Sequence, residues 1–276
     1  MKFRLKNADR LSVSVVIPCF QSQDCIDRAL RSVLAQTLIP EEIILVDDGN
    51  PPDFFSRIRA FQEESLPLSI RLIANAENSG PSFSRNRGWD AAQGDLIAFL
   101  DHDDAWHPHK LAWQVHCFHR HPNIAFAAHR SVCVDVSHIP EPWTKEIPTV
   151  PITWSALSRS NFFSTPTVML RREIPLRFQR QYRYGEDYDL WMRLVLAGFP
   201  GMFGDAPLTF LFKDRFGAGG LSGDLWKMER GIQRVFRNLG RDRLISPWQT
   251  RGLRLYAALK FIRRLAIRQF LPALSR

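Results

Sequence analysis

The 276-residue sequence is poor in cysteine, with only Cys19, Cys25, Cys117 and Cys133. Their spacings match neither a zinc finger nor a C-x-x-C redox pair, so we expect unpaired thiols in a reducing compartment. The sequence also lacks any stretch near the ~20 uninterrupted apolar residues that a membrane-spanning helix needs. Its first ten residues contain no apolar signal-peptide core, which predicts a cytoplasmic chain.

The composition indicates a folded chain whose C-terminal segment is strongly basic. Apolar residues make up 45%, and the length suits one domain with a terminal extension. Residues 226–276 hold 13 Lys/Arg and 2 Asp/Glu, a net charge of +11, whereas the other 225 residues have a net charge of −2. Such an end suits an anionic surface, either membrane or nucleic acid. The near-neutral body argues against nucleic acid, so we expect no nucleic-acid partner.

Short apolar runs alternate with amphipathic stretches. The predicted strands span residues 12–18, 42–46, 69–74, 95–100, 124–134 and 202–212, and the predicted helices span 24–35, 82–92, 110–120 and 186–197. This order predicts an α/β fold with a mostly parallel central sheet and helices on both faces. Residues 138–153 are predicted to form a long proline-rich connection, and two basic C-terminal helices are predicted on either side of Pro247.

Polar features follow the strands where an open parallel sheet binds ligands. They are residues 18–20, Asp47-Asp48, the segment around Arg85, and residues 101–104. Two neighbouring acidic clusters repel each other unless positive charge lies between them. Mg²⁺ or Mn²⁺, shared with substrate phosphates, would supply that charge. The alternative is that these acids cap turns and helices.

Glu186 and Asp187 open the helix EDYDLWMRLVLAG. Acids favour the first turn of a helix on dipole grounds alone. The functional alternative makes one of these carboxylates a general base on a rigid element, aimed into a cleft by the preceding Tyr184-Gly185 turn.

The sequence resembles family-2 glycosyltransferases in three ordered stretches: VSVVIPCFQSQDCIDRALRSVLAQTLIPEEIILVDDGN, NSGPSFSRNRGWDAAQGDLIAFLDHDDAWHPHKLAWQ and FQRQYRYGEDYDLWMRLVLAG. The resemblance covers roughly residues 12 to 200. It implies a GT-A fold over residues 1–224, with a Rossmann-like nucleotide-binding half at about 12–120 and an acceptor half at about 121–224. Residues 225–276 would then be a basic helical extension.

The resemblance also implies roles for individual residues. Those expected to bind the nucleotide-sugar are Pro18, Cys19, Phe20, Asp48, Arg85 and Asp101. Asp103, together with Asp101, would hold the divalent cation, Mn²⁺ or Mg²⁺. Asp187 would be the catalytic base, with Glu186 beside it. His102, in the middle of the D-x-D motif, is bulkier than is usual there and is expected to point away from the metal.

The activity implied is inverting transfer of one sugar from a UDP-linked donor to a glycan or lipid-linked acceptor. We expect it at the cytosolic face of the inner membrane, in cell-surface polysaccharide synthesis. The Q-x-x-R-W motif of processive synthases is absent. Lys213 or Arg215 could meet the diphosphate. The alternatives are a non-catalytic sugar-nucleotide-binding module and a nucleotidyltransferase, whose glycine-rich signature is missing after Pro18.

The last predicted helix is amphipathic but irregular. Its apolar face would comprise Leu255, Ala258, Leu259, Ile262, Leu265 and Ala266, opposite Lys260, Arg264 and Arg268. Leu253 and Phe261 interrupt this separation. Such a helix either lies on an anionic membrane or packs its apolar face on the domain, and the two alternatives are compatible.

Overall fold

The computed structural model describes residues 11–22, 25–51, 53–64, 68–134, 147–212 and 224–270. The strands are β1 (Val13–Cys19), β2 (Glu42–Asp47), β3 (Ser69–Ala74), β4 (Leu96–Phe99), β5 (Ala105–Trp106), β6 (Phe126–Cys133), β7 (Thr149–Ile152), β8 (Met169–Arg171) and β9 (Gly201–Leu211). The helices are α1 (Ile26–Leu34), α2 (Asp53–Glu64), α3 (Pro81–Ala91), α4 (Lys110–Arg120), α5 (Trp154–Arg159), α6 (Glu186–Leu196), α7 (Leu225–Arg241) and α8 (Pro247–Phe270).

The described strands form one mixed sheet in the order β3-β2-β1-β4-β8-β6-β9-β5, with β7 also paired to β9. Strands β3, β2, β1 and β4 are parallel, as the sequence predicts. Beyond them, β8 is antiparallel to both β4 and β6, and β5 and β7 are antiparallel to β9. Strands β5 and β8 are too short to leave a hydrophobic pattern, so sequence reasoning missed them.

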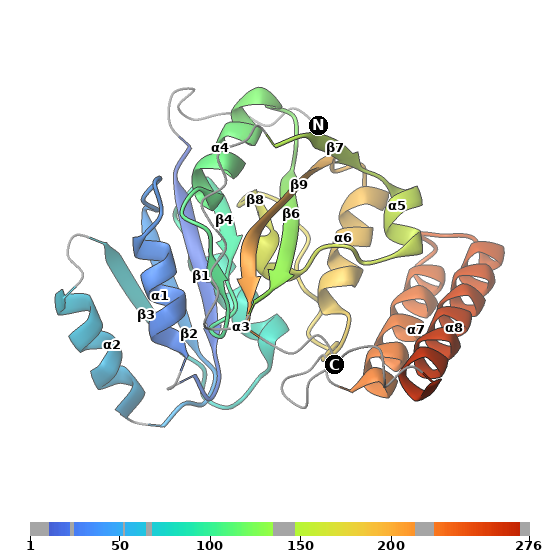
Figure 1. Cartoon of the computed structure of the whole chain (residues 1–276), viewed down its shortest axis with the longest axis horizontal. Coiled ribbons are helices and arrows are strands. Elements are labelled where there is room, and N and C mark those ends of the chain that lie inside the picture. Colours follow the sequence, from blue (N-terminus) through green and yellow to red (C-terminus); the bar gives the residue numbers. More distant parts are fainter. Residues whose placement is uncertain are drawn as a thin grey trace.

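Helices cover both faces of the sheet, as Figure 1 shows. Alternate residues of β1 explain why, because successive side chains of a strand point to opposite faces. Val15 and Ile17 belong to the apolar cluster that includes residues of α1, α2 and α4. Val16 belongs to the opposite cluster, which includes residues of α3 and α6. The α/β fold with helices on both faces is therefore confirmed.

The segment predicted as a long connection, 138–153, ends in strand β7, so that prediction is wrong for residues 149–152. Pro151 made the stretch look irregular, yet an edge strand accepts proline because it needs hydrogen bonds on one side only. The remainder of the connection up to residue 146, like Lys213 and Arg215, lies outside the described residues.

The two C-terminal helices form a hairpin that packs against α6 through α7. Val235 and Phe236 of α7 and Ala257 of α8 belong to the same apolar cluster as Trp191 of α6. At Gly231 a Cβ atom would lie 2.6 Å from the carbonyl oxygen of Tyr184, so only glycine allows this approach. No helix among the described residues has both the length and the apolar content to cross a bilayer. The predicted division at residue 224 stays a prediction.

Candidate active site

All the predicted site residues line one cavity of about 620 Å³. It lies beyond the carboxyl ends of β1, β2 and β4, against the first turn of α6. The predicted residues in its lining are Pro18, Cys19, Phe20, Asp48, Arg85, Asp101, Asp103, Glu186 and Asp187. Phe20 keeps 38% of its surface exposed, whereas Cys19 is buried. The fold thus brings together residues that are up to 169 positions apart in the sequence.

Asp47 and Asp48 hold the loops after β1, β2 and β3 at one side of the cavity. The Asp47 carboxylate accepts hydrogen bonds from the backbone N–H of Gly49 and Asn50, at 3.1 and 2.8 Å. Asp48 accepts from the backbone N–H groups of Ser79 and Gly80, both at 2.8 Å, and from an Asn75 side chain. The turn-capping alternative therefore applies to both acids, while Asp48 also faces the cavity.

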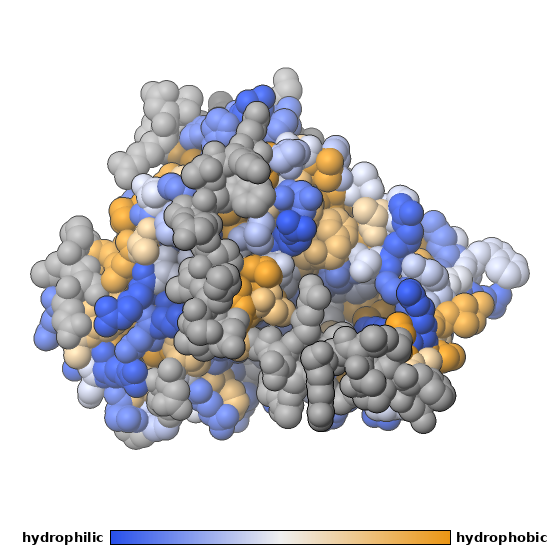
Figure 2. Space-filling model, viewed as in Figure 1, coloured by the Kyte–Doolittle hydropathy of each residue, from blue (hydrophilic) through white to orange (hydrophobic). Residues whose placement is uncertain are grey.

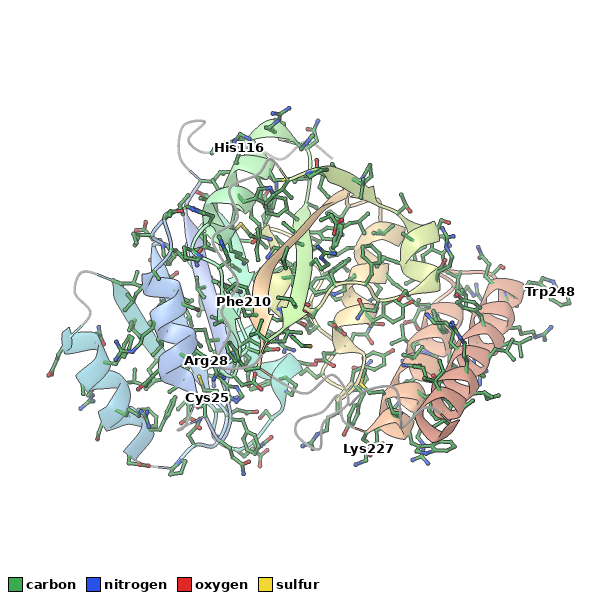
Figure 3. All side chains as sticks on the ribbon, in the orientation of Figure 1. Cys25, Arg28, His116, Phe210, Lys227 and Trp248 are labelled. Atoms are coloured by element: carbon green, nitrogen blue, oxygen red, sulfur yellow. The ribbon has the colours of Figure 1, made fainter. Side chains whose placement is uncertain are left out.

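The turn that carries Asp101 and Asp103 is fastened from two other elements. His102 Nδ1 lies 3.1 Å from the carbonyl oxygen of Pro18, in the loop after β1. The Arg28 guanidinium donates to the carbonyl oxygen of Asp103 at 2.6 Å and lies 3.9 Å above the Phe212 ring. Figure 3 shows Arg28 on α1, near Cys25. His102 thus lines the cavity and ties the D-x-D turn to the first loop.

Arg85 lies buried between two carboxylates. Its guanidinium contacts Asp101 at 2.7 Å and Glu186 at 3.1 Å, and it also lies 5.5 Å from the Phe178 ring centroid. Burial opposes the charge, but the two carboxylates raise the pKa of Arg85 above its ordinary value, so it stays protonated. Part of the positive charge that we expected from a metal is therefore supplied by the protein itself.

Glu186 and Asp187 point to different partners at the start of α6. Glu186 faces Arg85, and burial raises the pKa of Glu186 to about 7 although the Arg85 guanidinium opposes that rise. Asp187 accepts from the side chain of Asn161 at 3.1 Å and from the backbone N–H of Tyr188 at 2.7 Å. Burial raises the pKa of Asp187, and these two hydrogen bonds lower it. Glu186 and Asp187 thus both line the cavity, but Glu186 is held by an ion pair with Arg85 and Asp187 by hydrogen bonds.

The geometry joins two acidic turns, a buried arginine and a carboxylate on a helix in one cavity. Residues 14–177 match the sequence model of the family described as glycosyl transferase family 2. This chain belongs to glycosyltransferase family 2. The resemblance found in the sequence is thereby confirmed, and the protein is a glycosyltransferase.

Relatives of this family-2 glycosyltransferase match over most of its length. TuaG of Bacillus subtilis, a glycosyltransferase named for teichuronic acid biosynthesis, is 27% identical over 83% of this chain and 88% of its own. WfgD of Escherichia coli, named a UDP-Glc:α-D-GlcNAc-diphosphoundecaprenol β-1,3-glucosyltransferase, is 27% identical over 68% of this chain and 71% of its own.

Solved structures share the fold. Residues 1–349 of TarS from S. aureus, in complex with UDP-GlcNAc, superpose with a TM-score of 0.70 at 17% identity, over 95% of this chain and 77% of that TarS fragment. The mannosyltransferase PcManGT of Pyrobaculum calidifontis, in complex with GDP-Man and Mn²⁺, has a TM-score of 0.64 at 16% identity, over 93% of this chain and 76% of its own. At these identities the likeness concerns the fold alone.

The residues of this glycosyltransferase can supply only part of the coordination shell of a divalent cation. Across the described ranges, no group of three or more His, Cys, Asp or Glu side chains is arranged to hold a metal. Asp101 and Asp103 nevertheless place hard oxygen ligands on the cavity wall. Mg²⁺ is commonly bound by one or two carboxylates, with substrate phosphates and water completing its shell. Two carboxylates fit that arrangement.

Several cavity and loop residues escaped sequence reasoning. They are Arg28, Asn50, Asn161, Arg183 and Met228. Asn50 donates to the carbonyl oxygen of Cys19 and accepts from the backbone N–H of Ser22, so it joins the loops after β1 and β2. Its position after Asp47-Asp48-Gly49 is the one available signal, since asparagine favours turns.

Proposed function

We propose that this protein is an inverting glycosyltransferase that transfers one sugar from a UDP-linked donor to a hydroxyl group of a glycan or lipid-linked acceptor. The observation that carries the proposal is the position of Asp187, which lines the same cavity as the strand-end loops of the nucleotide half. Two comparisons support the proposal. The name of WfgD specifies UDP-Glc as donor and a diphosphoundecaprenol acceptor, and TarS has been solved in complex with UDP-GlcNAc.

The donor would lie along the loops after β1, β2 and β4. Pro18 and Cys19 form a wall for the base, and the half-exposed ring of Phe20 offers a stacking surface. Asp48, which the 75–80 loop holds through hydrogen bonds, would accept a hydrogen bond from the base. Asp103, with Asp101, would hold Mn²⁺ or Mg²⁺, which when bound neutralises charge developing on the diphosphate leaving group.

The acceptor would approach from the side of α6. A sugar hydroxyl is a poor nucleophile, so a base must take its proton as it attacks the anomeric carbon. Asp187 is suited to this step because its raised pKa makes it more basic than an ordinary aspartate. A single displacement of this kind inverts the anomeric centre. Arg85 holds Glu186 away from this role by pairing with it.

The setting that we propose is cell-surface polysaccharide synthesis at the cytosolic face of the membrane, by a catalytic domain of residues 1–224. The name of TuaG refers to teichuronic acid biosynthesis, and the acceptor in the name of WfgD is a membrane lipid.

A thermal-shift panel tests the donor site. Wild type, Asp103→Ala and the surface control Asp205→Ala are each heated with UDP, GDP, TDP or CMP, with and without Mn²⁺. A ligand at a hundred times its dissociation constant adds about 2.7 kcal/mol to the free energy of unfolding. We expect a Mn²⁺-dependent shift with UDP in wild type and Asp205→Ala, and none in Asp103→Ala. No shift with any nucleotide would overturn the proposed donor site, and a shift with GDP alone would overturn the UDP assignment.

A further inference from the structure

Helix α8 packs on the protein through a face different from the one that the sequence predicts. Ala257 and Phe261 are buried, Leu253 packs against the apolar core, and the Phe261 ring lies 4.8 Å from that of Trp226. These include the two residues that seemed to interrupt the apolar face. Of the two alternatives for this helix, the one in which the predicted apolar face packs on the domain is therefore wrong, because Leu255, Leu259 and Ile262 are exposed.

Basic residues that we expected on the solvent side turn toward the protein instead. Lys260 donates to the carbonyl oxygen of Arg159, at the end of α5, at 2.7 Å. Arg264 lies 3.5 Å from the carboxylate of Glu229 on α7. Because these contacts and the apolar contacts share one side of α8, the helix is anchored by that side and the opposite side faces outward.

The outward side of α8 carries large apolar residues that nothing in the described chain covers. Trp248, Leu255, Leu259 and Ile262, here called the outer stripe, are 78%, 64%, 57% and 60% exposed. At 100° per residue they fall within a narrow arc of the helix and form one line along it. Figure 3 shows Trp248 pointing away from the body, and Figure 2 shows apolar surface at the same edge of the molecule.

Positive charge borders the outer stripe. Arg251 and Arg263 are exposed and, by helix geometry, lie on opposite sides of it. The Arg251 guanidinium lies 5.2 Å from the Trp248 ring centroid. The sequence of α8, from Pro247 to Phe270, contains no acidic residue. A partner for this face must therefore combine an apolar interior with a negatively charged boundary.

We propose that α8 docks along the surface of an anionic lipid bilayer. The outer stripe would enter the boundary between head groups and acyl chains, while Arg251 and Arg263 contact lipid phosphates, as in helices that lie in the membrane interface. A second copy of the chain is a poorer occupant, because a two-fold pairing of this face brings arginines against arginines. The proposal concerns a surface outside the cavity, so it stands or falls independently of the donor and acceptor.

Vesicle flotation of the full chain tests this proposal. Wild type is mixed with vesicles of phosphatidylglycerol and phosphatidylethanolamine, or of phosphatidylcholine alone. The variants are Leu255→Gln/Leu259→Gln/Ile262→Gln and Arg251→Gln/Arg263→Gln, and the charge-matched control is Arg59→Gln/Arg120→Gln, on exposed sites of α2 and α4. All substituted side chains are exposed, so circular dichroism should show native melting for every variant.

We expect wild type and the control to float with the anionic vesicles and not with the neutral ones. Loss of two arginines should lower the partition coefficient about 30-fold at low salt, since each basic residue near such a surface contributes about fivefold. The apolar triple variant should lose at least about 100-fold. Wild type that stays unbound would overturn the proposal. So would a triple variant that still floats, and so would a wild-type dimer by light scattering that the triple variant converts to a monomer.

Discussion

The cavity and the outer face of α8 depart from the usual distribution of side chains in opposite directions. The cavity buries charge, with Arg85 and Glu186 almost out of contact with water. Helix α8 exposes apolar surface, with the ring of Trp248 largely in solvent. Charged residues are seldom buried unless paired, and large exposed apolar patches usually mark binding surfaces. Neither region is what stability alone would select.

The two departures differ in how the rest of the molecule compensates for them. In the cavity, Arg85 has two carboxylate partners and Asp48 accepts three hydrogen bonds, so a substitution there disturbs folding as well as binding. On α8 the outer-stripe residues belong to neither apolar core cluster of the described residues. Variants should therefore separate the regions, because one set affects stability or chemistry and the other affects only docking.

The largest effect is expected from Asp187→Asn, which keeps the shape of the side chain but removes the base. Turnover should fall about 10²–10⁴-fold, which is the usual contribution of a positioned general base. Donor affinity, measured by calorimetry with UDP and Mn²⁺, should stay unchanged. The exposed Asp205→Asn is the control. A variant that retains turnover within a factor of ten would show that another group accepts the proton.

Arg85→Met tests whether the buried charges of the cavity depend on one another. Removing the guanidinium takes the shared partner from the buried Glu186 and the partly exposed Asp101, so the free energy of unfolding should fall by about 3 kcal/mol. The matched control is Arg57→Met, whose ion pair with Asp27 is substantially exposed and should contribute less than about 1 kcal/mol.

Urea unfolding at neutral pH measures both variants of this pair. Equal losses for Arg85→Met and Arg57→Met would mean that the cavity tolerates uncompensated charge. In that case the buried ion pairs of Arg85 would contribute no more to stability than the exposed ion pair of Arg57.

Phe261→Ala and Leu259→Ala compare the two faces of α8 directly. Phe261 is buried against Trp226, so its truncation should cost about 3 kcal/mol of unfolding free energy. Leu259, two residues earlier on the outer stripe, should change stability by less than about 0.5 kcal/mol. Thermal unfolding measures both. A large loss from Leu259→Ala would show that the outer stripe is covered within the protein.

Much of the site was predictable because its signals are local. The strand-end turns that carry Asp48, Asp101 and Asp103 follow apolar runs, and parallel strands bring such turns to one edge. Contacts between distant segments left no such signal. Arg28 donates to the carbonyl oxygen of Asp103, which is 75 residues away in the sequence, and no sequence motif predicts this contact.

The orientation of α8 escaped prediction for a different physical reason. Apolar residues occur around most of the helix, so periodicity alone cannot tell which of them face the core. The deciding contact is tertiary: Phe261 fits against Trp226 of α7, and that contact turns Leu255 and Leu259 outward. The role of each cavity residue in binding or catalysis stays a prediction until variants are measured.

The smallest effect concerns the hydrogen bond between Asn161 and Asp187, which adjusts the base. Asn161→Ala removes a hydrogen bond that lowers the pKa of Asp187, so that pKa should rise further above its ordinary value. The base must be deprotonated to act, hence the acidic limb of kcat/KM should move to higher pH. On the alkaline side of that limb the rate should fall less than about tenfold. Thr153→Ala, which removes the N-cap of the neighbouring α5 without touching Asp187, should leave the limb in place. A uniform loss at every pH in Asn161→Ala, with the limb unmoved, would mean that Asn161 supports only the local fold and does not tune the base.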